Sequence, residues 1–180
     1  MKKLCAILPL ALILCFMVGC QDKEAMAELK KMKAPAALEE QNLELVRNAH
    51  LAWEKRDYRL IRNSYARDLS FYSPANSKQT NDLERLIMRA ETFYVAFPDY
   101  NITIEEIIAK GDKVALRAIV RGIHEEEYKG IQATGNKIEI SQTVFFRIDN
   151  GKIVEQRQEI DMLGFMQQLG MELKPKKAEK

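Results

Sequence analysis

The chain has 180 residues, which is enough for one domain of ordinary size. It carries 28 basic and 26 acidic residues, and removal of an N-terminal segment containing Lys2 and Lys3 would leave 26 of each sign. Because such a chain has no net charge, no overall electrostatic field favours nucleic acid or acidic substrates, and we expect no nucleic-acid partner.

The first 19 residues have the pattern of an export signal. Lys2 and Lys3 precede an unbroken apolar run over residues 4–19, which is shorter than the roughly 20 apolar residues that a membrane-spanning helix needs. The following Val18-Gly19-Cys20 resembles the lipobox of bacterial lipoproteins. The resemblance implies cleavage after Gly19, lipidation of Cys20 and a protein anchored to a bacterial membrane, on its periplasmic or extracytoplasmic face. An uncleaved apolar anchor is the alternative.

Cys20 would be the only cysteine of the processed chain, because Cys5 and Cys15 lie in the apolar run. With its sulfur used by the lipid, the domain would have neither a disulfide nor a reactive thiol, so its stability must come from an apolar core. The chain has only two histidines, His50 and His124, and no zinc-binding motif, so we expect no metal site.

Residues 38–171 are expected to form one domain. Residues 20–37 before it form a lipidated tether that Pro35 interrupts, and residues 172–180 after it form a basic, disordered tail.

The first half of this domain is predicted to be helical. Apolar residues recur at helical spacing from Leu38 to Trp53, over residues 58–66, and from Thr80 to the residue before Pro98. Pro98 ends the third helix because proline cannot continue the helical hydrogen bonding. The apolar stripes are expected to face the core.

The second half is predicted to consist of antiparallel strands followed by one helix. Alternating segments separated by turn signals cover residues 102–109, 114–124, 137–148 and 153–161, and a closing helix covers residues 162–170. Asn150-Gly151 favours a type I′ hairpin turn, and such short connections join antiparallel neighbours. Helices followed by a meander of strands indicate an α+β fold.

Side-chain alternation assigns residues to the two faces of the predicted sheet. Gln142 shares the apolar face of its strand with Phe146, and His124 has the parity of the apolar face of the preceding strand. The last strand offers a polar face made up of Glu155, Arg157, Glu159 and Asp161. A bent sheet over helices would gather these faces around a concave pocket, the usual form of a small-molecule site.

Each of these polar residues also has a purely structural explanation. His124 fits a half-exposed histidine at a strand end, and Gln142 fits a hydrogen-bonded core amide. Asp161 directly precedes a predicted helix and fits an N-cap, and Arg157 with Glu155 fits an exposed ion pair.

Several short segments in the second half occur at the spacing found in a known family. They are Phe97-Pro98-Asp99, Gly111-Asp112, Arg117, Arg121-Gly122, His124, Gly130-Ile131, Thr134-Gly135, Phe146-Arg147-Ile148, Gly151-Lys152-Ile153-Val154-Glu155, Asp161, Leu163-Gly164 and Gln167-Gln168-Leu169-Gly170. On these segments the chain resembles the SnoaL-like polyketide cyclases, also called ester cyclases. The resemblance implies the nuclear transport factor 2-like fold, an α+β cone in which a strongly bent antiparallel sheet wraps over helices around a deep pocket.

The resemblance also implies a reaction and a set of site residues. It implies a cyclase, lyase or isomerase that needs no cofactor and no metal, with Asp161 and His124 as the catalytic residues. The predicted ligand-binding residues for a small, largely apolar molecule are Gln142, Arg157, Trp53, Phe146 and Tyr94.

The family often has tryptophan in place of Arg157, and a cation there would weaken Asp161 as a base. Two alternatives to an enzyme remain. One is a non-catalytic module that binds a small apolar ligand in the cell envelope, and the other is an interaction module that forms a homodimer through the open face of its sheet.

Overall fold

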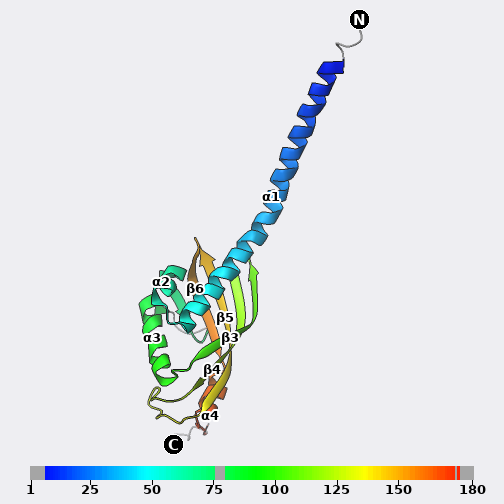
Figure 1. Ribbon diagram of the computed structural model, residues 1–180. Helices are drawn as coiled ribbons and strands as arrows, with labels where there is room; N and C mark the ends of the chain where they lie inside the picture. Colours follow the sequence, from blue (N-terminus) through cyan, green and yellow to red (C-terminus); the bar gives the residue numbers. More distant parts are fainter. Residues whose placement is uncertain (1–6, 76–79, 173, 175–180) are drawn as a thin grey trace, which may run out of the picture. The chain divides into compact units, whose positions relative to one another are not determined.

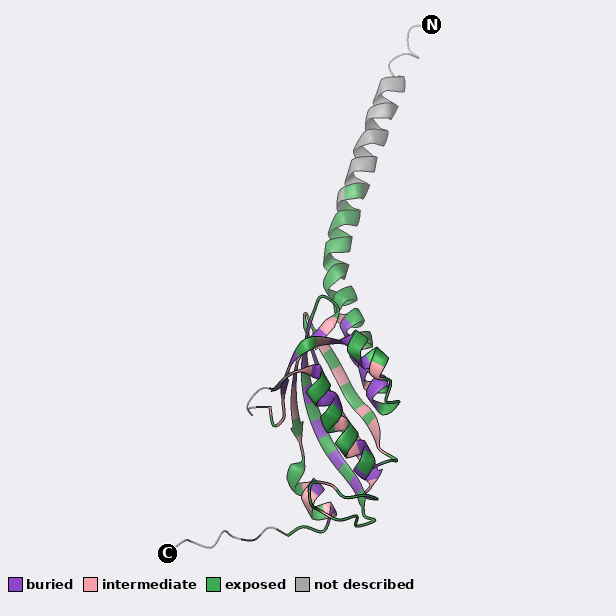
Figure 2. Cartoon of the chain, turned by 90° about the vertical axis from the view of Figure 1, so that its left-hand side faces the viewer, coloured by how far each residue is buried: buried purple, intermediate pink, exposed green. Residues whose placement is uncertain are grey.

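The computed structural model describes residues 7–75, 80–172 and 174. The chain divides into two units, Met1–Glu39 and Glu40–Lys180. The first unit contains the N-terminal part of helix α1 (Ile7–Glu54), in which residues 25–38 are all exposed, as Figure 2 shows. Within the described part of the chain, no helix is long and apolar enough to cross a membrane.

Helix α1 runs through Pro35, where the sequence predicted an interrupted tether. A proline inside a helix removes one hydrogen bond and costs about 3 kcal/mol. Apart from Pro35, residues 25–37 are all Ala, Glu, Leu, Lys or Met, which are the strongest helix formers. Their combined preference explains why the helix persists across the proline. The predicted tail over residues 172–180 lies mostly outside the described residues.

The second unit begins within α1, and its described residues form three further helices and one sheet. After α1 come α2 (Tyr58–Ser64), β1 (Tyr65–Tyr72), β2 (Thr80–Asn81), α3 (Leu83–Ala96), β3 (Asn101–Lys110), β4 (Lys113–Ile123), β5 (Lys137–Asp149), β6 (Lys152–Ile160) and α4 (Met162–Gln168). The strands form a six-stranded sheet in the order β2-β1-β6-β5-β4-β3. The sheet is strongly curved, and α2 and α3 lie on the same side of it (Figure 1). The predicted α+β arrangement is confirmed.

The strand β1 was not predicted. The sequence favoured a helix over residues 58–66, whereas α2 ends at Ser64 and β1 begins at Tyr65 and pairs in parallel with β6. The register of this pair shifts between Tyr65 and Ser70. The irregularity interrupts the alternation of buried and exposed side chains by which a strand is recognised in a sequence.

The two hairpins that join β3 to β4 and β5 to β6 have two-residue turns. Asp149 pairs with Lys152, and the two residues between them, Asn150 and Gly151, have φ angles of +48° and +71°. Positive φ at both central positions is the type I′ geometry that this dipeptide predicted.

The pairing of β5 with β6 decides which face of β6 points toward the helices. Phe146 pairs with Gln156, Val144 with Gln158, and Gln142 with Ile160. Directly paired residues point to the same face of a sheet, so these β6 residues share the buried face of β5. The sequence had placed the opposite set, from Glu155 to Asp161, on this face, and that assignment is wrong.

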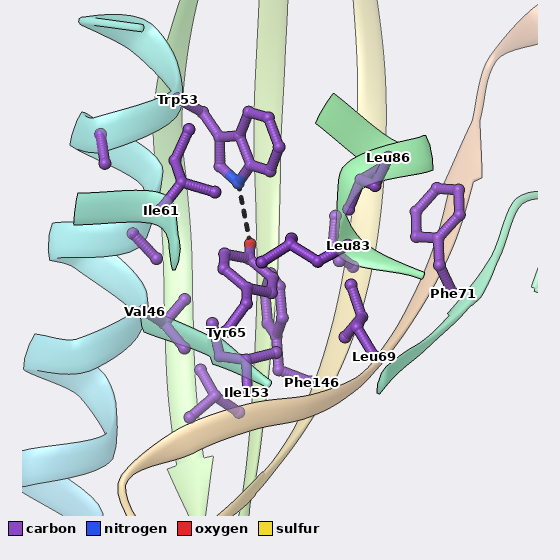
Figure 3. Close-up of a cluster of buried hydrophobic side chains, with 14 of the residues drawn as sticks. Val46, Trp53, Ile61, Tyr65, Leu69, Phe71, Leu83, Leu86, Phe146 and Ile153 are labelled. Carbon is purple, nitrogen blue, oxygen red and sulfur yellow. Dashed lines mark hydrogen bonds between the residues drawn. The ribbon is translucent and has the colours of Figure 1, made fainter. Parts of the chain in front are cut away.

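Two clusters of buried apolar side chains hold the second unit together. The larger one packs the end of α1, α2 and α3 against the sheet, with Trp53, Tyr65 and Phe146 among its members (Figure 3). The smaller one joins the end of α3 to α4 and includes Phe97 and Phe165. Together they form the apolar core that was expected to stabilise a domain without disulfides.

Candidate functional site

A pocket with a volume of about 170 Å³ lies between the inner face of the sheet and helices α1, α3 and α4. Its volume is close to the roughly 150 Å³ of an apolar protein cavity known to bind benzene, so it offers room for about one ring. Its aromatic walls include Trp53, Tyr65, Phe71, Phe93, Tyr94 and Phe146. Arg89 and Met162 are the lining residues exposed to solvent, and they mark where the pocket opens.

Four of the five predicted ligand-binding residues line this pocket. Trp53 comes from α1, Tyr94 from α3, and Gln142 and Phe146 from β5. Helical spacing and strand alternation were informative for these four residues, because both patterns report directly which side chains face inward.

Arg157, the fifth, lies on the other face of β6. Its Nε donates a hydrogen bond to Glu155 Oε1 at 2.9 Å, and its guanidinium lies 3.9 Å from the centre of the Tyr72 ring. Its Nη1 also donates to the Ala75 carbonyl oxygen at 3.0 Å. The ion pair that the sequence offered as the structural explanation is present, and the predicted ligand contact does not fit this placement.

Asp161 is exposed and caps helix α4. Its Oδ1 accepts a hydrogen bond from the Gly164 N–H at 2.8 Å, which is the N-cap role that the sequence offered as an alternative. Asp161 stands between Ile160 and Met162, which both line the pocket, but it does not itself belong to the wall. Its catalytic role remains a prediction.

His124 is fully buried, not half-exposed as its structural explanation supposed. Its ring stacks on Phe97 with the ring centres 5.1 Å apart, and its Nδ1 accepts a hydrogen bond from the Thr134 N–H at 3.3 Å. Its Nε2 therefore carries the hydrogen, and within the described residues this atom has no hydrogen-bond partner. Because His124 is outside the pocket wall, its catalytic role also remains a prediction.

Hydrogen bonds within the protein decide which atoms of the polar pocket side chains remain available to a ligand. Trp53 Nε1 donates to the Tyr65 hydroxyl at 3.0 Å, as Figure 3 shows, and this hydroxyl donates to Gln156 Oε1 at 3.2 Å. In the same way, Gln158 Nε2 donates to Gln142 Oε1 at 2.5 Å. The NH₂ groups of Gln142 and Gln156 make no hydrogen bond to the part of the chain that the structure describes, so both can donate to a bound molecule.

His50 lines the pocket and was not predicted as a site residue. Its Nε2 is buried and has no hydrogen-bond partner in the described ranges. Burial lowers the pKa of His50 to about 4, so the ring is neutral at neutral pH. The signal for it was present in the sequence, since His50 follows Val46 by four positions and precedes Trp53 by three, on the buried stripe of α1.

The charge of the pocket wall is unusual for a site of acid–base chemistry. Arg89 is the one lining residue with a full charge among the described residues, and none of these lining residues is an aspartate or a glutamate. The described wall residues can therefore bind apolar surface and donate hydrogen bonds, but none of them supplies a carboxylate base.

The model of the SnoaL-like polyketide cyclase family matches residues 43–169. Among solved structures, IdmH from Streptomyces antibioticus, a candidate polyketide cyclase, is 26% identical with a TM-score of 0.64, covering 73% of this chain and 99% of that one. AclR from Streptomyces galilaeus, a candidate hydroxylase, is 27% identical with a TM-score of 0.65, covering 72% and 95%. No curated protein matches the chain.

A third solved structure, a candidate SnoaL-like polyketide cyclase from Jannaschia sp. CCS1, is 20% identical with a TM-score of 0.66 and covers 76% of this chain and 96% of that one. At this identity the likeness concerns the fold alone. Together with the observed sheet, these matches confirm the cone-shaped fold that the resemblance implied.

The depressed pKa of His50 predicts a pH-dependent stability. An unfolded chain binds a proton at His50 near pH 6.5, whereas the folded chain does so only near pH 4. As the pH falls from 7 to 4, the wild type should therefore lose roughly 3 kcal/mol more unfolding free energy than His50→Gln does. Urea titrations at several pH values measure this difference, and parallel curves for the two proteins would contradict it.

Proposed function

This chain belongs to the SnoaL-like polyketide cyclase family, and we propose that its function is to bind a small, largely apolar molecule in the pocket between the sheet and helices α1, α3 and α4. The two more similar solved structures described above are named as candidates for different activities, a cyclase and a hydroxylase. Family membership therefore supports a shared pocket more directly than it supports any one reaction.

The observation that carries this proposal is the composition of the pocket wall. Nine aromatic side chains line a space for about one ring. Two glutamine NH₂ groups and the His50 Nε2 have no hydrogen-bond partner there among the described residues. Unpaired polar groups in an apolar enclosure are costly unless a bound molecule or water pairs with them. A ligand with an apolar ring and at least one polar substituent would satisfy both kinds of surface.

Binding can be followed through Trp53, which is the only tryptophan of the chain and lines the pocket. A panel of one-ring aromatic probes, both neutral and charged, should include members that change its fluorescence in a saturable way. At 100 times its Kd such a probe should also raise the unfolding free energy by about 2.7 kcal/mol. Ala90→Phe places a ring in the pocket and should weaken probe binding at least tenfold.

The matched control is Val95→Phe, which adds a similar ring to the same helix at a position that is 63% exposed and outside the pocket wall. It should bind the probes as the wild type does. The proposal is wrong if no probe binds saturably, or if a folded Ala90→Phe variant binds them with unchanged affinity.

A second candidate function is acid–base catalysis of the cyclase type, with Asp161 as the base. The favouring observation is its position between two lining residues at the opening of the pocket, Ile160 and Met162. A rotation of the side chain away from Gly164 would release the carboxylate from its capping hydrogen bond. The cost would be that of one helix cap, about 1 kcal/mol.

This candidate can be tested before any substrate is identified. A base near the pocket should accelerate exchange of the methyl protons of acetophenone, which lie beside a carbonyl, with deuterium from the solvent. Asp161→Asn should abolish most of that acceleration, by a factor of about 100 or more, while keeping the capping hydrogen bond and therefore the stability. Equal exchange rates for the two proteins, measured by NMR, would exclude Asp161 as the base.

We also propose that Cys20 carries a lipid that anchors the protein to a membrane of the cell envelope. The support is the sequence pattern of two lysines, a short apolar run and Val18-Gly19-Cys20. Cells that express the full chain should incorporate labelled palmitate into the protein, and Cys20→Ser should lose the label. Persistent labelling of this variant would overturn the anchoring proposal.

The homodimer through the open face of the sheet also stays a prediction.

A further inference from the structure

Arg89 stands at the opening of the pocket and has no acidic partner among the described residues. It lies on α3, is exposed, and lines the pocket together with Phe71, whose ring centre is 5.5 Å from its guanidinium carbon. Two other exposed arginines do have carboxylate partners: Arg62 pairs with Glu84, and Arg85, on the same helix as Arg89, pairs with Asp82. Within the described ranges, Arg89 has no such pair, so its charge is available to a bound molecule.

The rest of the pocket wall is also unsuited to cations. The described lining residues include no carboxylate, and His50 is neutral at neutral pH because burial lowers its pKa to about 4. A ligand with a positive charge would lose its hydration without finding a counter-charge. A negative charge near the opening would meet Arg89, whose planar guanidinium matches a carboxylate in geometry.

Deeper in the pocket, the hydrogen-bond pattern favours a second oxygen on the ligand. Gln142 and Gln156 each accept a hydrogen bond at Oε1, from Gln158 and Tyr65, so both present their NH₂ groups as donors. Donors of this kind pair with a carbonyl, hydroxyl or carboxylate oxygen. The pocket that these donors and Arg89 line holds about one ring.

We infer that the natural ligand is a compact, one-ring carboxylic acid that carries a further oxygen substituent, with its carboxylate at Arg89 and its second oxygen at the glutamine NH₂ groups. The inference rests on the proposed function, since it describes what the same pocket selects. It adds a specificity-determining residue, Arg89, and an anionic ligand class.

Benzoate and benzamide test the part played by Arg89, because they have nearly the same shape and differ in charge. The wild type should bind benzoate five- to tenfold more tightly than benzamide, and benzylamine more weakly than either. Arg89→Gln should remove the preference for benzoate, so that the ratio of the two affinities falls to about one. High salt should reduce the same preference, because the opening of the pocket is exposed to solvent.

The matched control is Arg85→Gln, which removes an exposed arginine from the same helix, one turn away and outside the pocket wall. It should keep the wild-type ratio of the two affinities. The ratio of the benzoate and benzamide affinities is informative because a general loss of protein stability would weaken the binding of both ligands alike.

The glutamines are tested by comparing 4-hydroxybenzoate with benzoate. The added hydroxyl should improve binding at least threefold in the wild type, and Gln142→Met, which keeps the length of the side chain, should cancel this gain. Gln132→Met, at an exposed loop position outside the pocket, should retain it.

The outcomes separate this inference from the proposed function. Equal affinities for benzoate and benzamide, or a preference that survives in Arg89→Gln, would overturn the inference and leave the binding function intact. Tighter binding of benzylamine than of benzoate would also overturn the inference and leave the binding function intact. If none of the probes binds, both the proposed function and the inference are wrong.

Discussion

The hydrogen-bonded register between β5 and β6 is the constraint on which the rest of the structure depends. It sets Gln142, Val144 and Phe146 beside Ile160, Gln158 and Gln156, and so places amides and apolar side chains on one surface. A shift of one residue would turn every β6 side chain to the opposite face. Glu155 and Arg157 would then face the helices, and the part of the pocket wall that β6 supplies would carry charged side chains in place of uncharged ones. The type I′ turn at Asn150 and Gly151 fixes this register locally.

The sequence predicted the fold and part of the site, for reasons that differ from strand to strand. In β5, every second residue from Ile138 to Ile148 is buried, so alternation alone identified its inner face. In β6, both faces carry polar residues, and alternation could not distinguish Gln156 and Gln158 from Glu155 and Arg157. Only the pairing with β5 resolves that choice, and pairing is a property of the folded sheet.

Other misses have equally specific causes. The strand β1 contains a register shift, which hides its periodicity, and its partner β6 lies far away in the sequence. His50 has the spacing of a core residue, and histidine is a residue whose burial a hydropathy pattern does not signal. Its unpaired Nε2 becomes visible only when the surrounding hydrogen bonds are known.

The buried polar groups of this domain fall into two classes. The chain from Trp53 through Tyr65 to Gln156 is satisfied at each step, and it ties α1 to the two neighbouring strands β1 and β6. A network of this kind fixes how the helix and the two strands are oriented, which apolar contacts alone would determine less well. Among the described residues, His50 Nε2 and the NH₂ groups of Gln142 and Gln156 lack a partner at the pocket wall, where a ligand can complete them, whereas the unpaired His124 Nε2 is buried outside that wall. The aromatic walls thus supply apolar contact area to a bound molecule, and the hydrogen-bonding groups fix its orientation.

The parallel pairing of β1 with β6 has a consequence for how the protein is made. Tyr65 and Gln156, which meet in the pocket wall, are 91 positions apart in the chain. Closing so long a loop is entropically unfavourable until the β5–β6 hairpin exists to receive the strand, so β1 is expected to join the sheet late in folding. A chain synthesised from its N-terminus therefore displays Trp53, Tyr65 and Phe71 as unpaired apolar surface until nearly its last strand has emerged. Throughout that interval this apolar surface is open to non-native contacts, and no ligand can help the chain fold, because the pocket that would bind the ligand does not yet exist.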